Sequence, residues 1–431
     1  MIKPFGNLCI ILFLSTIISC SKNDENIVTE LNTANTIQSF TFSLAENPID
    51  ITITGQIDEE RNTITFETPL GTDISSLLPQ IQTSKGASYS PEGPQDFNKT
   101  VRYTVTAENG SVRDYRVIWE ISQRDVLLTL LNENPDHTLS WDITDNNIAN
   151  WEGVTTDVEG HVTELHLREK NIPNIPRVMG RLPKLTHLIL QGNSIREIPV
   201  EIGDLSNLTQ LFLDRNQLSS LPLEIKQLKR LTVLGLTDNA ISSFPLAIEE
   251  LSNLEHLYLG RNALTTIPEN IERLGNLKEL SLYENNLTRV PIAITKLKKL
   301  IYLELQFNEI EKIPTEIGQL VKLEELYLEN NRIRKVPKEI GQLAQLGYLF
   351  LNDNQIEDVP QELGELSLLE IFSLRDNALR NVPEEIGQLT GLRFLRLNNN
   401  PNLLTLPHVV CKLRDTGTQI SLDPHTICIV N

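Results

Sequence analysis

Tyrosine, phenylalanine and glutamate side chains recur at matching intervals through the second half of this 431-residue chain. Glu304, Tyr327 and Phe350, for example, are each separated by 23 residues. Aromatic rings that share a rigid surface can anchor a partner, and carboxylates beside them attract lysine and arginine. The spacing therefore predicts a binding surface, provided that a repeated element holds these side chains next to one another.

Motifs for covalent or metal-assisted catalysis are missing from the sequence. It contains no Gly-x-Ser-x-Gly, no His-Glu-x-x-His, no phosphate-binding loop and no Cys-x-x-Cys. Glu164, His166 and His187 could approach one another on neighbouring strands and hold a metal ion, but a glutamate–histidine surface pair is the preferred interpretation. We therefore expect no catalytic residue, no metal and no cofactor.

A 23-residue repeat supplies the missing element. Ten copies of Leu-x-x-(Leu/Phe)-x-Leu-x-x-Asn begin at Leu185 and end at Asn400, and a less complete copy begins at Val162. The asparagines of the ten copies are Asn193, Asn216, Asn239, Asn262, Asn285, Asn308, Asn331, Asn354, Asn377 and Asn400. A proline follows in step in every copy, as Pro291 and Pro314 do.

This pattern resembles the leucine-rich repeat solenoids whose turns run Leu-Pro-x-Glu-Ile-Gly-x-Leu after the strand, as in 383–389, and the resemblance covers residues 162–407. The physical logic agrees with it, because one short strand and its return segment cannot bury an apolar side alone and neighbouring turns must stack. The leucines fill the shared core, and the asparagine amides satisfy backbone groups where each strand ends. We interpret the asparagines as structural and not as ligand contacts.

In such a solenoid the residues between the leucines point out of the concave sheet. The ligand-binding candidates on this face are Phe212, Tyr258, Tyr283, Tyr302, Glu304, Phe307, Glu325, Tyr327, Tyr348, Phe350 and Phe394. Eleven strands at ~4.8 Å span roughly 50 Å, which suits a protein partner better than a small-molecule pocket. We expect a protein ligand, one that can carry a basic patch. A glycan stacked on the tyrosines is the alternative, and a sideways ladder of rings on a solvated acidic face is the non-functional interpretation.

Both ends of the repeat array carry residues that could close it. Trp141 and Trp151 resemble the N-terminal cap of plant-type leucine-rich receptors, although that cap's cysteine pair is absent, and we expect both rings in the cap core. Near the far end, residues 420–422 form a twelfth, degraded strand flanked by Cys411 and Cys428, which are either a disulfide or two buried thiols. Capped edges favour a monomer.

The first twenty residues have the features of a targeting signal. A positive start and an apolar run over 8–18 are followed by Ile17-Ile18-Ser19-Cys20, which resembles the lipobox of bacterial lipoproteins and implies lipidation of Cys20. The Ser-Lys-Asn-Asp-Glu stretch after it resembles the export signal of Bacteroidetes-type surface lipoproteins. We expect an outer-membrane lipoprotein that faces the cell exterior, with periplasmic retention as the alternative.

Residues 37–122 alternate apolar and polar positions and are rich in threonine, isoleucine and valine, which is typical of half-buried strands. Asn109-Gly110 between two such runs indicates a tight hairpin. The length suits an immunoglobulin-like sandwich. The segment 103–117 resembles a module common in Bacteroidetes surface lipoproteins, which implies a spacer and no activity of its own.

Charge and length complete the prediction. With 38 basic and 57 acidic residues the formal net charge is −19, which argues against nucleic acid as a partner. The predicted fold class is a multidomain chain in which an all-β immunoglobulin-like sandwich precedes an α/β leucine-rich repeat solenoid with a parallel concave sheet. The expected parts are signal peptide 1–19, acidic tether 20–36, sandwich 37–122, N-terminal cap 123–161, repeats 162–407 and C-terminal cap 408–431.

Overall fold

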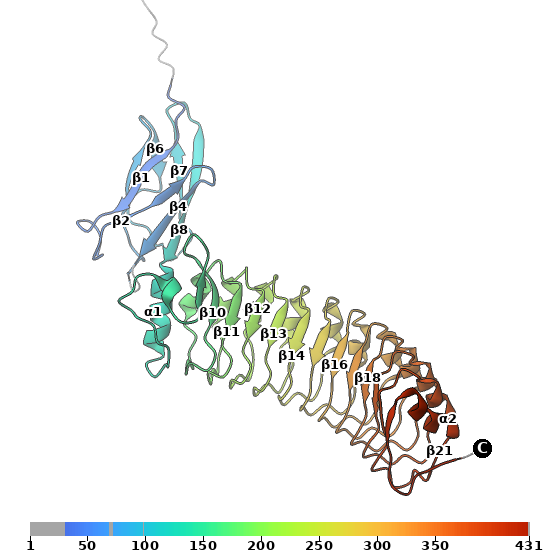
Figure 1. The fold of residues 1–431 in the computed structure, drawn as a ribbon. Helices are drawn as coiled ribbons and strands as arrows, with labels where there is room; N and C mark the ends of the chain where they lie inside the picture. The colour runs from blue at the N-terminus through green and yellow to red at the C-terminus, as the bar shows by residue number, and fades with distance from the viewer. Residues whose placement is uncertain (1–30, 69–71, 98, 430–431) are drawn as a thin grey trace, which may run out of the picture. The chain divides into compact units, whose positions relative to one another are not determined.

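The computed structural model describes residues 31–68, 72–97 and 99–429. Its contacts divide the chain into two compact units. The first lies within Met1–Phe66 and Asp73–Ile118, and the second comprises Glu67–Thr72 and Trp119–Asn431. Each unit is described by itself below (Figure 1).

The first unit consists of two β-sheets made of short strands. One sheet has the order β2-β1-β5 and the other β3-β4-β8-β7-β6. The strands are β1 Ile37–Phe42, β2 Ile53–Thr54, β3 Gln56–Asp58, β4 Thr63–Thr68, β5 Gln80–Thr83, β6 Ser88–Ser90, β7 Arg102–Thr106 and β8 Val112–Ile121. The turn at Asn109-Gly110 joins β7 to β8, which pair antiparallel from Arg102↔Arg116 to Thr106↔Val112.

Aromatic side chains form the core of this unit. Phe40, Phe42 and Phe66 are fully buried, and their ring centroids lie 4.9 to 5.6 Å apart. Tyr103 and Tyr115, which face each other across β7 and β8, are fully buried as well. The alternation of buried and exposed residues along β1 and β7 is therefore the signal that the sequence carried.

The second unit is a solenoid with one continuous sheet. The sheet has 13 strands, in which β9 pairs antiparallel with β10 and every later neighbour is parallel and in register (Figure 1). Its strands are β9 Val154–Thr156, β10 Val162–His166, β11 His187–Ile189, β12 Gln210–Phe212, β13 Val233–Gly235, β14 His256–Tyr258, β15 Glu279–Ser281, β16 Tyr302–Glu304, β17 Glu325–Tyr327, β18 Tyr348–Phe350, β19 Ile371–Ser373, β20 Phe394–Arg396 and β22 Gln419–Ser421.

The return segments of the turns are short 3-10 helices, each of which follows a proline. They are η2 Arg177–Arg181, η3 Val200–Asp204, η4 Leu223–Gln227, η5 Leu246–Glu250, η6 Glu269–Arg273, η7 Ile292–Lys296, η8 Thr315–Gln319, η9 Lys338–Gln342, η10 Gln361–Glu365 and η11 Glu384–Gln388. Proline supplies the fixed φ that starts each helix, and five residues suffice for a tight 3-10 turn. Apart from the 3-10 returns, α1 Gln123–Glu133 and α2 His408–Cys411 are the α-helices of the described chain.

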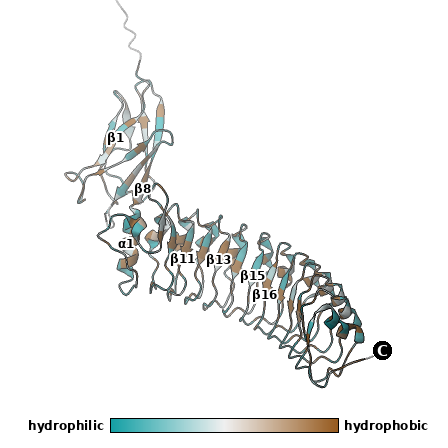
Figure 2. Ribbon diagram, in the orientation of Figure 1, coloured by the Kyte–Doolittle hydropathy of each residue, from teal (hydrophilic) through white to brown (hydrophobic). Residues whose placement is uncertain are grey.

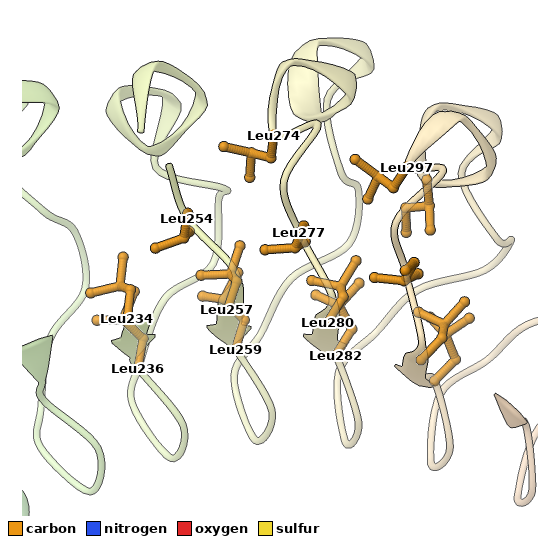
Figure 3. Packing of buried hydrophobic residues seen from close by; sticks show 14 of the residues in the cluster. Leu234, Leu236, Leu254, Leu257, Leu259, Leu274, Leu277, Leu280, Leu282 and Leu297 are labelled. Atoms are coloured by element: carbon orange, nitrogen blue, oxygen red, sulfur yellow. The ribbon is translucent and has the colours of Figure 1, made fainter. Parts of the chain in front are cut away.

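Leucine and isoleucine fill the space between the strands and the return helices. Figure 3 shows leucines of successive turns, such as Leu257 and Leu280, stacked side by side between the two layers. Both are fully buried, as are nearly all the leucines at the repeat positions. In Figure 2, apolar residues (brown) and polar residues (teal) lie close together along the solenoid turns. Burial of each such side chain contributes about 2 kcal/mol, so stacking of neighbours stabilises the array.

The repeated asparagines connect neighbouring turns through hydrogen bonds. In the central repeat, Asn308 Nδ2 donates to the carbonyls of Leu282 (2.9 Å) and Leu305 (3.0 Å). Asn308 Oδ1 accepts from the amide of Leu287 at 3.0 Å. The same three contacts recur along the row, and they pair backbone groups that the strand ends leave without partners.

Both ends of the solenoid are closed. At the start, the rings of Trp141 and Trp151 stack at 4.9 Å, and both are almost fully buried, which confirms their assignment to the cap core. Helix α1 and η1 Ile148–Asn150 complete this cap. At the far end β22 pairs with β20, which confirms a twelfth repeat strand.

The C-terminal cap is held by a disulfide and a small sheet. Cys411 and Cys428 form a disulfide across a separation of 17 residues. Strands β21 Thr405–Leu406 and β23 Ile427–Cys428 pair in parallel, and η12 Lys412–Thr416 lies between the cysteines in the chain. The predicted fold class, a β-rich domain followed by a leucine-rich solenoid with a parallel sheet, is confirmed. The return segments are 3-10 helices.

Candidate functional site

Two rows of side chains project from the concave sheet on either side of the buried central leucines. Along the first row Tyr302 pairs with Glu325, and Glu325 pairs with Tyr348. Along the second row Glu304 pairs with Tyr327, and Tyr327 pairs with Phe350. Because the strands are in register, rings and carboxylates alternate along the first row, and a carboxylate is followed by two rings along the second. We call Tyr302, Glu304, Glu325, Tyr327 and Phe350 the acid–aromatic patch.

Three rings of the patch form a ladder across successive strands. The centroids of Tyr302 and Tyr327 lie 5.3 Å apart at an interplanar angle of 50°. Tyr327 and Phe350 lie 5.0 Å apart and are nearly parallel, at 10°. Tyr327 therefore has a neighbouring ring on each of its two sides. Tyr348 lies on the same strand as Phe350, but in the described chain it makes no ring contact with the ladder.

The tyrosine hydroxyls of the face are used by its own carboxylates. Tyr302 Oη donates to Glu304 Oε1 at 2.9 Å, and Tyr327 Oη donates to Glu325 Oε2 at 2.5 Å. Two turns before Tyr302, Tyr258 Oη donates to Glu279 Oε2 at 2.6 Å. Burial first, and then these carboxylates, raise the pKa of Tyr302, Tyr327 and Tyr258 far above the usual tyrosine value. The three hydroxyls are thus fixed, neutral donors.

Three buried oxygen atoms beside the patch lack hydrogen-bond partners in the described chain: Ser281 Oγ, Gln306 Oε1 and Glu329 Oε2. Gln306 Nε2 donates to Glu304 Oε1 at 3.2 Å, so its amide end lies next to the patch. Burial, and then the charges of Glu304 and Asp353, raise the pKa of Glu329 to about 7. An unpaired buried acceptor costs about 1–3 kcal/mol, and a ligand with N–H donors would remove that cost.

Phe307 follows the patch strand in an unfavourable backbone conformation. Its φ is 56°, in the left-handed region, and its side chain is 48% exposed. The equivalent residue of the other turns also has positive φ but is polar or charged, as in Arg261 and Asp353, or is glycine, as in Gly192. A bulky residue in this conformation costs about 1–2 kcal/mol. The exposed phenylalanine is therefore unfavourable in two ways, through its backbone conformation and through the contact of its ring with solvent.

The remaining aromatic candidates lie apart from the patch. A Cβ added to Gly260 would come within 2.2 Å of the Tyr283 ring, and one added to Gly235 within 2.8 Å of Phe212. These two rings therefore lie over the backbone of a neighbouring turn. Near the C-terminal end, the Phe394 ring lies 6.0 Å and 5.7 Å from the guanidinium carbons of two arginines, in a basic environment unlike that of the patch.

The possible metal ligands on the first strands contact one another as glutamate–histidine pairs. Glu164 Oε2 lies 3.1 Å from His166 Nε2, and Glu164 Oε1 lies 3.6 Å from His187 Nδ1. Within the described residues, the group of three such side chains with ligand atoms within 4.8 Å of one another is Asp157, Glu159 and His161. That group is a hairpin loop in which Asp157 Oδ1 accepts from the amides of Glu159 and His161.

The structure thus brings five of the predicted residues into one patch with Phe307 beside them, and it places Phe212 and Phe394 elsewhere on the face. Sequence reasoning did not find Ser281 and Gln306. Gln306 occupies a position that is polar in many turns, and the position of Ser281 varies from isoleucine to arginine, so the sequence carries no signal that separates either residue from a solvated one. Their burial results from neighbouring side chains and is visible only in three dimensions.

The predicted targeting region and the question of a membrane-spanning helix are taken together. Cys20, the expected lipidation site, lies outside the described residues. Among the described residues, none of the helices has the length and apolar character that crossing a bilayer requires.

Family models match both units. The model "SGBP, N-terminal", a domain of the Bacteroidetes surface glycan-binding protein type, matches residues 37–118. The model "Leucine rich repeat" matches 160–218, 229–287 and 275–333, and the model "Leucine-rich repeat region" matches 338–415. No curated protein matches the chain.

Similar solved structures are leucine-rich repeat proteins. The ectodomain of the Arabidopsis thaliana receptor kinase GASSHO1/SCHENGEN3, in complex with CASPARIAN STRIP INTEGRITY FACTOR 2, is 28% identical over 71% of this chain and 38% of that chain, with a TM-score of 0.61. The Arabidopsis receptor kinase HAESA, in complex with the peptide hormone IDA and the co-receptor SERK1, is 25% identical over 71% of this chain and 53% of that one, with a TM-score of 0.61. The functional domain of InlJ from Listeria monocytogenes shares the fold at 23% identity, covering 60% of this chain and 53% of that one, with a TM-score of 0.52. The chain therefore spans about half or less of these relatives' length.

Proposed function

This chain is a leucine-rich repeat protein whose N-terminal domain belongs to the SGBP family, and from that premise we propose that it is a non-enzymatic, lipid-anchored binding protein of the cell surface. It recognises a protein ligand through the concave face of the solenoid, as an adhesin or receptor does. The segment that docks on the acid–aromatic patch carries lysine or arginine.

The observation that carries this proposal is the arrangement of rings and carboxylates in the patch. Tyr327 stacks on Phe350, and the Tyr302 ring lies against it at an angle of 50°, so the Tyr327 ring is flanked by two neighbouring rings. A sugar that stacks on an aromatic ring needs a free face, whereas a peptide can pack on ring edges. The carboxylates of Glu304 and Glu325 and the unpaired oxygens beside them suit the N–H donors of a guanidinium or ammonium group.

The size of the face and the neighbouring structures support the same function. Twelve parallel strands at ~4.8 Å form a platform roughly 50 Å long. A surface of this length is large enough for one side of a standard protein–protein interface. Two similar receptors were solved with polypeptide ligands, CASPARIAN STRIP INTEGRITY FACTOR 2 and the peptide hormone IDA. A rigid platform of this kind loses little entropy when it binds.

The lack of catalytic motifs and the presence of a predicted targeting signal complete the proposal. Both domain types are binding modules, and the sequence holds no catalytic motif. We assign lipid attachment to Cys20, followed by the tether, with the protein on the outer membrane and facing outward. In this proposal no cofactor or metal takes part, the acidic balance argues against nucleic acid, and the protein acts as a monomer.

A peptide array tests the proposal. The purified chain is applied to immobilised peptides that contain lysine or arginine and to matched peptides in which these are replaced by glutamine. We expect retention on the basic set and a loss of about 2 kcal/mol in binding free energy in the Tyr327→Ala variant. The matched control is Phe394→Ala, which truncates an aromatic residue of the same face outside the patch. Equal losses in the two variants would move the ligand site away from the patch.

A glycan remains the second candidate because the N-terminal family is of the surface glycan-binding type. In that function the chain is an accessory protein of a nutrient-uptake system. Ionic strength separates the two candidates, because an acidic interface for a basic peptide weakens steeply with salt and neutral sugar binding changes little. Retention on neutral glycans that persists at 1 M salt and is lost in the Tyr327→Ala variant would favour the glycan.

A further inference from the structure

Two arginines of the N-terminal unit face each other across a strand pair. Arg102 on β7 is the direct partner of Arg116 on β8. The amide of Arg116 donates to Asn62 O at 2.9 Å, and the amide of Val117 donates to Val101 O at 3.0 Å. Arg102 and Arg116 therefore form a non-hydrogen-bonded pair, the type in which opposite side chains are closest. Like charges in this position destabilise a sheet.

These arginines line a pocket together with a third. The pocket has a volume of about 330 Å³ and is bounded by Arg61, Asn62, Thr63, Arg102, Asp114 and Arg116. Residues 37–118 contain four arginines in all, and three of them line this pocket. The unit is otherwise rich in acidic residues, so the gathering does not follow from composition.

The charges in the pocket are poorly compensated. In the described part of the chain, neither Arg102 nor Arg116 forms an ion pair, and Arg61 pairs with Asp58 at the exposed turn at 3.1 Å. The pocket's own carboxylate, Asp114, accepts a hydrogen bond from Thr104 Oγ1 at 2.5 Å. Three guanidinium groups around one carboxylate leave a net positive site that would bind an oxyanion.

Asn62, one of the lining residues, also carries an acceptor without a partner in the described chain. Asn62 Oδ1 is buried and has no hydrogen-bond partner among the described residues. Its residue is held at a φ of 52° by the turn that leads into β4. None of the lining side chains is aromatic or aliphatic. The site therefore suits a ligand that is anionic and at the same time rich in hydroxyl donors.

We propose that this pocket binds an acidic polysaccharide, one whose sugars carry sulfate or carboxylate groups. The arginines take the anionic group by charge-assisted hydrogen bonds, and Asn62 Oδ1 and the Asp114 carboxylate accept hydroxyls of the same sugar. The site is separate from the acid–aromatic patch, whose charge is of the opposite sign. It gives the N-terminal unit a binding role in place of that of a spacer.

The test uses the full chain and three pairs of probes. Dextran sulfate is compared with dextran, which has the same backbone without the charge, and polygalacturonate is compared with a neutral galactan. Polyglutamate is an acidic polymer without sugar and is compared with polyglutamine. Binding is measured by calorimetry at about 0.1 M salt, where charges within ~10 Å still interact. We expect binding to dextran sulfate, polygalacturonate or both, and none to the neutral polymers.

Variants locate the site. Arg102→Gln with Arg116→Gln should lower the affinity at least about tenfold, and it should leave or raise the melting temperature because it removes a like-charge pair. The control, Lys85→Gln with Lys99→Gln, removes the same charge elsewhere in the unit and should change the affinity less than about twofold. Arg61→Gln alters a side chain that is 82% exposed and pairs only with the exposed Asp58 among the described ion pairs, so its expected loss of affinity comes with little change in stability.

Three results would overturn the proposal. Equal losses in the arginine and lysine variants would mean that binding is a general effect of charge. Binding of polyglutamate as tight as that of the polysaccharides would assign the pocket to an acidic protein. An absence of binding to both acidic polysaccharides would leave the pocket without this ligand class. The probes carry no basic residues, so they do not test the peptide proposal for the concave face, and loss of binding in the arginine variants separates this pocket from a glycan site on that face.

Discussion

Replacement of Glu329 by glutamine should change how the stability of the solenoid depends on pH. The Glu329 carboxyl group lies in the concave face next to the acid–aromatic patch, and its Oε2 atom is buried without a partner. Burial, and then the charges of Glu304 and Asp353, raise its pKa from 4.5 to about 7. The Glu329→Gln variant keeps the size of the side chain and removes the titration.

The sign and magnitude follow from proton linkage. The folded state holds the proton more tightly than the unfolded state, so the free energy of unfolding falls as the pH rises from 4.5 through about 7. Each pKa unit corresponds to about 1.4 kcal/mol, which gives about 3 kcal/mol for the full shift and about 2 kcal/mol once the partial exposure of the group is discounted. Below pH 4.5 the group is protonated in both states and contributes no pH dependence.

The assay is urea denaturation of wild type and Glu329→Gln at pH 4.5, 6 and 8. Other carboxylates titrate identically in both proteins, so the quantity of interest is the difference between them. We expect wild type to lose about 2 kcal/mol relative to the variant between pH 4.5 and 8. A difference that stays constant over this range would refute the buried, proton-holding state of Glu329. If the patch binds cationic peptides, affinity should rise over the same pH range in wild type and not in the variant.

Three further predictions concern single features of the solenoid. Asn308→Ala should destabilise the chain by about 3 kcal/mol or more in urea denaturation, because three buried backbone groups lose their partner; the control, Asn276→Ala, removes an exposed bond to Ser252 O and should cost less than about 1 kcal/mol. Phe307→Asn should raise stability by about 1 kcal/mol, since asparagine tolerates the left-handed conformation, while binding of basic peptides weakens; a loss of stability would contradict the backbone argument. Reduction of the Cys411–Cys428 disulfide should destabilise the C-terminal cap by about 3 kcal/mol, which is measured as faster hydrogen exchange of residues 394–421. Unchanged exchange would show that β22 and η12 hold the cap without the disulfide.

The repeat made most of the fold predictable. A 23-residue period with leucine at three strand positions permits few structures, because each turn exposes an apolar side that only another turn can cover. The parallel sheet, the capping tryptophans and the twelfth strand followed from that requirement. The 3-10 form of the return segments did not, since the choice between 3-10 and α depends on how closely neighbouring turns pack.

The candidate site was predictable only in outline. The sequence shows that Tyr302, Tyr327 and Phe350 come from three successive turns and that all three point out of the same face of the sheet. It does not show that Tyr327 stacks on Phe350 with Tyr302 tilted against it, because side-chain rotamers are set by the neighbours that each ring meets. That difference separates a peptide site from a sugar platform.

The same division holds for charge. The excess of acidic residues and their place beside tyrosines are matters of composition and period, and these the chain determines by itself. The buried state of Glu329 depends on tertiary structure. So does the meeting of Arg61, Arg102 and Arg116, which come from a turn and two strands and carry no common motif. Period is a local property that every turn repeats, whereas burial and electrostatic contact depend on distances between atoms that only the folded chain brings together.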